Sequence, residues 1–114
     1  MLTHIVLMKP RADLSVANTQ SLIDAFERAI HDISTVRNVR VGKRVLHGAG
    51  YERNAPDAAD YLVEIDFDDL AGLQTYLQHP AHTELGARFG QSLSAALVYD
   101  FDAGGIERLR RGLL

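Results

Sequence analysis

The sequence predicts an α+β fold, with a four-stranded antiparallel sheet and helices on one of its faces. Two observations lead to this prediction. Apolar residues recur with period two in several short segments, and with helical spacing in the segments between them. The chain has 114 residues, of which 46% are hydrophobic and 24% are charged. This length and composition are typical of one folded domain rather than of a disordered segment or a membrane protein.

The first half contains a strand, a helix and a second strand. Residues 2–9 are rich in β-forming side chains and are followed by a proline, so we expect a strand there. Ser15 suits a helix N-cap, and apolar residues from Leu22 to Ile33 follow at helical spacing. Residues 39–45 alternate valines with arginines and a glycine, which indicates another strand.

The second half repeats the pattern after a long hairpin loop at residues 48–60, which is rich in glycine and polar residues. We expect a strand at residues 61–67, a short helix capped by Asp68 or Asp69, a further helix beginning at Pro80, and a last strand at residues 97–101. The order β-α-β-β-α-β, with the second helix in two pieces, is that of a ferredoxin-like fold. We expect one domain over residues 1–102 and a C-terminal tail over residues 103–114, which begins with an alanine and two glycines.

Both faces of the predicted sheet carry apolar side chains. In the first strand Ile5 and Leu7 share one face, while Val6 and Met8 share the other with His4. Helices cover only one face, so the other would leave apolar surface in water. Burying such surface stabilises by roughly 25 cal/mol per Å². We therefore expect a homodimer in which two sheets pack face to face.

The composition argues against several classes of partner. The net charge is −3, so no basic excess indicates nucleic-acid binding. The chain has no cysteine, which excludes disulfides and thiol catalysis. The apolar run near the start, from Ile5 to Met8, is too short for a signal peptide or a membrane span. We expect a cytoplasmic protein.

Residues 78–82, with the sequence QHPAH, place two histidines around a proline. A histidine has an unperturbed pKa of about 6.5, which suits a general base near neutral pH, and the helix start at His82 would lower that pKa and favour the neutral form. The alternative is a structural histidine that packs at the helix start. His79 is explained by helix initiation next to Pro80. A metal site would need a carboxylate or a cysteine at a recognisable spacing, and the sequence has none, so no metal is expected.

Four segments of the chain resemble the stress-responsive dimeric α+β barrel (Dabb) family. They are HIVLMK, VRNVRVGKRV, YLVEIDFDDLAGLQTYLQHPAH and LVYDFD, and they span the chain to about residue 102. The resemblance implies a ferredoxin-like fold whose subunits join their sheets into a barrel. Some members of the family are stress-induced proteins without known chemistry, and one is an enzyme that works without a cofactor.

The resemblance also implies roles for individual residues. In the enzymatic member, a histidine ending the HPAH motif is the general base, an upstream tyrosine assists, and a first-strand histidine lines the pocket. The matching positions are His82, Tyr76 and His4. A further pocket histidine of that enzyme is replaced here by Tyr61, so the chain departs from the enzyme at that position.

The leading hypothesis is a homodimer whose subunits each bind a small hydrophobic or aromatic molecule between sheet and helices. His82 would act as base and Tyr76 as hydrogen-bond donor in cofactor-free acid-base chemistry on a carbonyl compound. One alternative is a non-catalytic stress-protective or structural protein, and another is a cofactor-independent oxygenase. The cavity walls are expected to come from His4, Val6, Phe26, Tyr61, Tyr76, His82 and Phe89.

Overall fold

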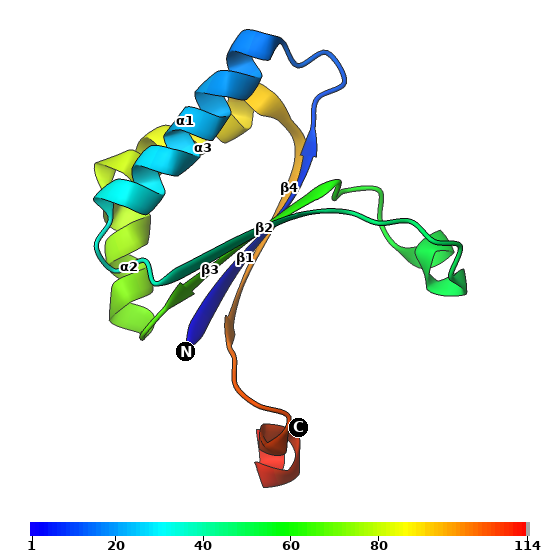
Figure 1. The fold of residues 1–114 in the computed structure, drawn as a ribbon, viewed down its shortest axis with the longest axis vertical. Helices are drawn as coiled ribbons and strands as arrows, with labels where there is room; N and C mark the ends of the chain where they lie inside the picture. Colours follow the sequence, from blue (N-terminus) through cyan, green and yellow to red (C-terminus); the bar gives the residue numbers. More distant parts are fainter. Residues whose placement is uncertain (114) are drawn as a thin grey trace.

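The computed structural model describes residues 1–113 as one four-stranded sheet with three helices against a single face (Figure 1). A short 3₁₀ helix, Gly50–Asn54, lies in the loop between the second and third strands. None of the helices in the described part of the chain is long and apolar enough to cross a membrane. The elements are β1 (Leu2–Pro10), α1 (Val16–Asp32), β2 (Asn38–Lys43), β3 (Tyr61–Phe67), α2 (Leu70–Gln78), α3 (Pro80–Ser92) and β4 (Leu93–Asp102).

The sheet has the strand order β2-β3-β1-β4, and every neighbouring pair is antiparallel. β1 is central: His4 stands opposite Ile65 on one side and opposite Asp100 on the other. Directly opposed residues share a face of the sheet. This register confirms the predicted ferredoxin-like fold and its antiparallel sheet.

Three side chains begin the helices, as the sequence predicts. The Ser15 hydroxyl accepts a hydrogen bond of 3.0 Å from the Asn18 amide at the start of α1. A carboxylate oxygen of Asp69 accepts one of 2.9 Å from Gly72 at the start of α2. His79 caps α3, with Pro80 as the first helical residue. Each cap satisfies an amide that has no partner inside its helix, which typically stabilises by about 1 kcal/mol.

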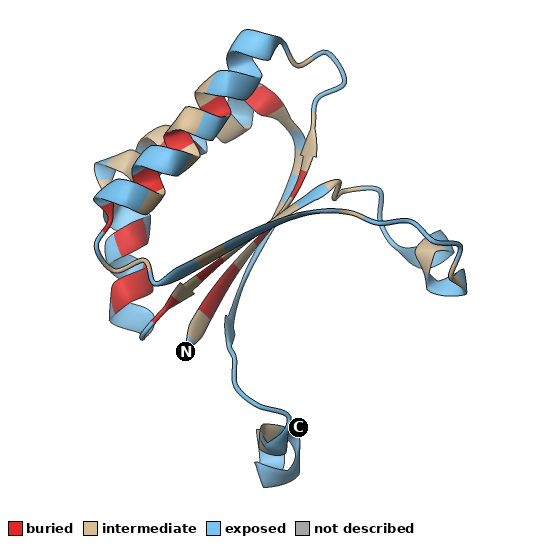
Figure 2. Cartoon of the chain, in the orientation of Figure 1, coloured by how far each residue is buried: buried red, intermediate tan, exposed pale blue. Residues whose placement is uncertain are grey.

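The core fills the space between the sheet and the helices, and Figure 2 shows the buried residues on these facing surfaces. Small side chains on α1 let that helix approach α3, and Phe26 of α1 meets Phe89 of α3 with 5.6 Å between ring centroids. Arg28 and Glu84 join the same two helices at the surface. The buried apolar residues are Val6, Met8, Leu22, Ala25, Ala29, Ile33, Val63, Ile65, Phe67, Leu73, Tyr76 and Leu85.

The face of the sheet turned away from the helices is apolar along β1 and β4. The register places Ile5 beside Tyr99 and Leu7 beside Leu97 on this face. Tyr99 is 51% exposed, and the neighbouring Phe101 is also half exposed. Large aromatic side chains left this open to water mark an interaction surface.

Two boundaries differ from the sequence prediction. β4 begins at Leu93, not at residue 97, so the strand includes four residues before the predicted start. The predicted start is too late because Leu85, Phe89 and Leu93 recur at helical spacing, which suggests that the helix continues. In the structure α3 ends at Ser92. β2 ends at Lys43 because the chain then leaves the sheet for the hairpin loop, which projects away from the helices (Figure 1).

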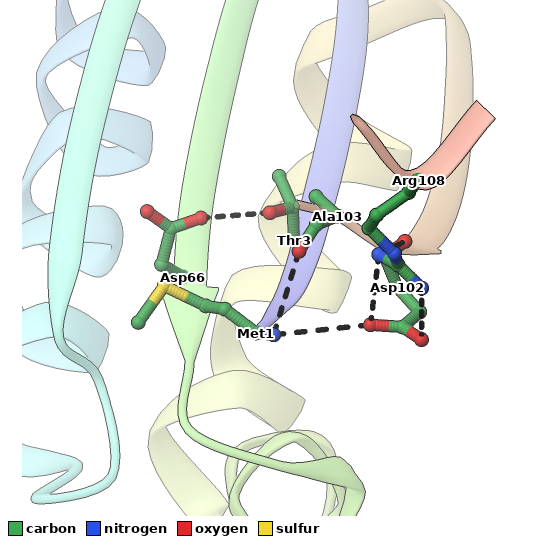
Figure 3. Close-up of polar contacts among 6 residues, drawn as sticks. All are labelled: Met1, Thr3, Asp66, Asp102, Ala103 and Arg108. Atoms are coloured by element: carbon green, nitrogen blue, oxygen red, sulfur yellow. Dashed lines mark hydrogen bonds and ion pairs between the residues drawn. The ribbon is translucent and has the colours of Figure 1, made fainter. Parts of the chain in front are cut away.

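The chain beyond β4 leads into a short helical segment, Leu109–Leu113, within the predicted tail. Asp102 anchors it, because its carboxylate lies 2.9 Å from the Arg108 guanidinium and 3.8 Å from the amino group of Met1 (Figure 3). The Arg108 guanidinium holds the pKa of Asp102 below its usual range. On the neighbouring strands, the Thr3 hydroxyl donates a hydrogen bond of 2.9 Å to Asp66 (Figure 3). The start of β1 and the end of β4 are thus held together by polar contacts.

Candidate functional site

Three predicted site residues from three different elements lie together. The ring of Tyr76, on α2, packs between two histidines: its centroid is 5.7 Å from that of His4 and 4.8 Å from that of His82. Both contacts are edge-to-face, which suits aromatic rings in a packed interior. His4 lies on the helix side of β1, as its alternation with Val6 and Met8 predicts. We call His4, Tyr76 and His82, together with Asp100 described next, the polar cluster.

Asp100 of β4 completes the polar cluster. Its Oδ1 lies 2.6 Å from Nδ1 of His4, directly across the strand pair. A carboxylate only accepts hydrogen bonds, so the Nδ1–H of His4 donates and the Nε2 atom is left as the acceptor when the ring is neutral. His4 is buried, whereas Asp100 is partly exposed. The pair fixes the orientation of the His4 ring beneath Tyr76.

Tyr76 is a hydrogen-bond donor rather than a base in this environment. Its side chain is 1% exposed. Burial disfavours the charged phenolate and raises the pKa of Tyr76 to about 12. The phenol therefore stays protonated at any pH near neutrality and can donate to a developing negative charge.

His82 is held toward its neutral form. It lies in the first turn of α3, where its backbone amide donates to the His79 carbonyl at 3.0 Å. Burial is the main cause that lowers the pKa of His82, and the nearby His4 lowers it further, while a backbone hydrogen bond with Leu77 acts in the opposite direction. A half-buried neutral imidazole can accept a proton, so this geometry permits base chemistry.

A glutamine at position 82 should make the stability of the protein less sensitive to acid. The pKa of His82 is lower in the folded chain than its ordinary value of 6.5, so the unfolded chain binds the proton first as the pH falls. The contribution of neutral His82 to the free energy of unfolding is therefore complete above the ordinary pKa, and it is lost as the pH falls through the pKa of the folded chain. Urea unfolding between about pH 7.5 and about pH 5 should show a smaller loss for His82→Gln than for wild type.

The control for this measurement is His31→Gln, which removes an exposed histidine from the last turn of α1. That variant should follow the wild-type profile. If His82→Gln also follows the wild-type profile, the buried environment described for His82 is wrong.

An apolar cavity of about 950 Å³ lies between α1 and the sheet, toward the end of β1 that carries Met8. It exists because α1 packs on α3 and leaves the helix-side face of β2 uncovered, so that Val41 is 75% exposed. The volume lies within the range of ligand pockets. Its lining comprises Met8, Pro10, Leu14, Thr19, Leu22, Ile23, Phe26, Glu27, Ile30, Val41, Gly42, Lys43, Tyr61, Leu62, Val63 and Leu93.

The structure thus separates residues that the sequence hypothesis placed on one cavity wall. Phe26 and Tyr61 line the cavity. Val6 is buried in the core between the cavity and the polar cluster, and Phe89 packs against Phe26 from α3. On β1, His4 belongs to the polar cluster and Met8 lines the cavity, and these two residues are about 13 Å apart along the strand. His4, Tyr76 and His82 are not among the described residues that line this cavity.

Sequence reasoning missed two features of the site. The first is Asp100, for which the signal is an acidic residue on the helix side of a strand. The cavity face of α1 was also missed: Thr19, Ile23, Glu27 and Ile30 recur at helical spacing beside the core stripe, and Ile23 is exposed. A second, partly apolar stripe on a helix indicates that the helix faces a second surface in addition to the core.

No group of three or more histidine, cysteine or acidic side chains is placed to hold a metal ion among the described residues. His79 has a structural role instead, because its Nδ1 accepts a hydrogen bond of 3.0 Å from the Ala81 amide at the start of α3. Helix initiation therefore accounts for His79, as expected from its place beside Pro80.

The order β-α-β-β-α-β, with the antiparallel strand order β2-β3-β1-β4 and helices on one face, defines an α+β protein of ferredoxin-like fold. The sequence profile of the stress responsive A/B barrel domain, Dabb, matches residues 2–103. The chain belongs to this family.

Three proteins illustrate what this chain is similar to. Olivetolic acid cyclase from Cannabis sativa is 21% identical over 98 residues, which are 86% of this chain and 92% of that protein. The structure of a hydroxynitrile lyase from Passiflora edulis superposes with a TM-score of 0.72 at 14% identity, over 91% of this chain and 96% of that one. A dimeric ferredoxin-like protein of unknown function from Thermobifida fusca gives a TM-score of 0.67 at 22% identity, over 88% of each chain. The proteins similar to this chain thus include a cyclase and a lyase, and one of the solved structures is of a dimeric protein.

Proposed function

We propose that this protein binds a small hydrophobic or aromatic molecule in the cavity between α1 and the sheet. The observation that carries the proposal is the cavity itself: about 950 Å³ in volume and lined mostly by apolar side chains. An apolar space of this size, with a few polar groups at its edge, is the usual form of a small-molecule site. Phe26 and Tyr61 offer aromatic surfaces to the ligand.

We propose, second, that the polar cluster performs cofactor-free proton transfer on a carbonyl compound. His82 accepts a proton from the carbon beside the carbonyl, and the Tyr76 phenol donates a hydrogen bond to the enolate oxygen that forms. His4, which is hydrogen-bonded to Asp100, supports the ring of Tyr76. The 2.6 Å contact between His4 and Asp100 favours this function over a purely structural role, since it brings an acidic side chain to a histidine that itself packs against Tyr76.

The partner in this proposal is a second copy of the chain, packed through the open sheet face. The apolar side chains along β1 and β4 support this arrangement, and so do the dimeric relatives. A dimer leaves the cavity on the helix side of each sheet, away from the interface.

A thermal-shift screen of aromatic and polyketide-like compounds, run on three forms of the protein, tests cavity and cluster separately. Wild type should be stabilised by some of these compounds. Val41→Trp should abolish the shifts, because the larger side chain enters the cavity from an exposed position and does not disturb the core. His82→Ala should keep the shifts produced by cavity binding and lose turnover of any compound that is converted.

The outcomes separate the alternatives. Absence of any shift in wild type would favour a non-catalytic protective or structural protein. Shifts that persist in Val41→Trp would place the ligand elsewhere. Turnover that persists in His82→Ala would rule out His82 as the base.

A further inference from the structure

The cavity carries polar groups that the polar cluster does not use. Most of its lining is apolar, and the exceptions with side-chain oxygen or nitrogen atoms are Thr19 and Glu27 on α1, and Lys43 and Tyr61 on the sheet. The last two stand directly opposite each other, Lys43 at the end of β2 and Tyr61 at the start of β3. Opposed residues share a face, so an ammonium group and a phenol extend from neighbouring positions on the same wall.

The charge of Lys43 is not balanced by a described side chain of the protein. It makes no ion pair with any residue in the part of the chain that the structure describes, whereas the other lysine, Lys9, is paired with Asp57. Lys43 does not take part in a helix cap or in the polar cluster. A cation that lines an apolar cavity and lacks a carboxylate partner is available to a ligand.

The solvent exposure of the cavity wall increases from its inner part to its mouth. Met8, Leu22 and Val63 are buried at its inner part. Lys43 and Tyr61 are exposed, so they stand at the mouth, where a charged group keeps much of its hydration. This gradient matches a molecule with an apolar body and a charged or acidic end.

We propose that the ligand is an anionic amphiphile, and that Lys43 and Tyr61 bind its carboxylate at the cavity mouth while the apolar body lies against α1. This inference rests on the proposed function and names the class of molecule that the cavity takes. Lys43 supplies the opposite charge, and the Tyr61 hydroxyl donates a hydrogen bond to the second carboxylate oxygen. Glu27 lies on the α1 wall and repels the carboxylate toward the sheet.

Isothermal titration calorimetry of the full chain with three probes of equal length tests the proposal. The probes are decanoate, decanol and decylamine, each below the concentration at which it aggregates. The variants are Lys43→Met, which keeps the apolar stem and removes the charge, and Tyr61→Phe, which removes only the hydroxyl. Arg53→Met is the control, because it removes one positive charge from the hairpin loop, outside the cavity lining.

Wild type should bind decanoate more tightly than decylamine, and added salt should weaken the binding of decanoate but not that of decanol. Lys43→Met should weaken decanoate binding by about fivefold, the upper end of what a partly exposed ion pair supports. It should leave decanol binding within about twofold, and Arg53→Met should bind all three probes as wild type does. Tyr61→Phe should weaken decanoate binding by a smaller factor than Lys43→Met.

Two negative outcomes have different meanings. If none of the three probes binds to wild type, the cavity is not a small-molecule site, and the proposed function fails together with this inference. If decanol binds and Lys43→Met leaves the preference for decanoate unchanged, the cavity binds ligands but the anionic head site is wrong. Tighter binding of decylamine would assign the head site to Glu27 and would likewise overturn the inference.

Discussion

Phe67→Ala should lower the free energy of unfolding by about 3–5 kcal/mol, the range found when a buried phenylalanine is truncated. Phe67 is fully buried at the end of β3, and its ring centroid lies 5.2 Å from that of Tyr76. Removing the ring deletes apolar contacts and leaves a space that the sheet and α2 cannot fill by a small shift. Equilibrium urea unfolding measures the loss, and the slope with urea should stay near that of wild type.

The same substitution should also disturb the polar cluster, because Tyr76 loses one of the rings that hold it. Leu70→Ala is the control: Leu70 begins α2 but is 55% exposed, so its truncation should cost no more than about 0.5 kcal/mol. If Phe67→Ala costs no more than Leu70→Ala, the packing of α2 against β3 is not the one described.

Tyr99→Glu should weaken dimerisation by at least about 2 kcal/mol, which is close to thirtyfold in the dissociation constant. Tyr99 lies on the open face beside Ile5, among the apolar side chains of β1 and β4. In a face-to-face dimer a carboxylate at this position would lose its water without gaining a partner. Sedimentation equilibrium over a range of protein concentrations measures the change.

Val98→Glu provides a matched control for Tyr99→Glu. Val98 is the preceding residue of β4 and is 49% exposed, but its side chain points to the helix side of the sheet. The acidic residue should leave dimerisation within about twofold, because this face does not meet the second copy in the proposed dimer. If both variants dissociate equally, or if neither does, the interface is not the open sheet face. Melting temperatures that rise with protein concentration in wild type but not in Tyr99→Glu would be a second sign of the dimer.

The strand pattern made most of the fold predictable from the sequence. Alternating residues predict β2, a run of β-forming residues closed by a proline predicts β1, and local polar residues predict the caps at Ser15 and Asp69, because these signals act over a few positions. The start of β4 was misplaced because Leu93 fits both a helical and a strand pattern. Only the pairing of β4 with β1 decides between helix and strand at this position, and a short segment of sequence does not reveal that pairing.

The site was predictable only in part, for a similar reason. The cluster of His4, Tyr76 and His82 followed from a family resemblance, and the structure brings the three rings together. The cavity lies elsewhere because its position depends on how far α1 stands from the helix-side face of β2. That spacing is set by the packing of α1 on α3, through pairs such as Phe26 and Phe89, and no short segment of sequence encodes it.

The central place of β1 has a consequence for the order in which the chain folds. Leu2 pairs with Phe67 and with Asp102, so the first strand forms its last contacts with the last strand of the domain. Until β4 docks, one edge of β1 presents unpaired amide and carbonyl groups next to exposed apolar side chains. Pairing over such sequence separations slows folding. A nascent chain therefore cannot complete its sheet until residue 102 has left the ribosome, and a truncation before β4 leaves a strand edge open to aggregation.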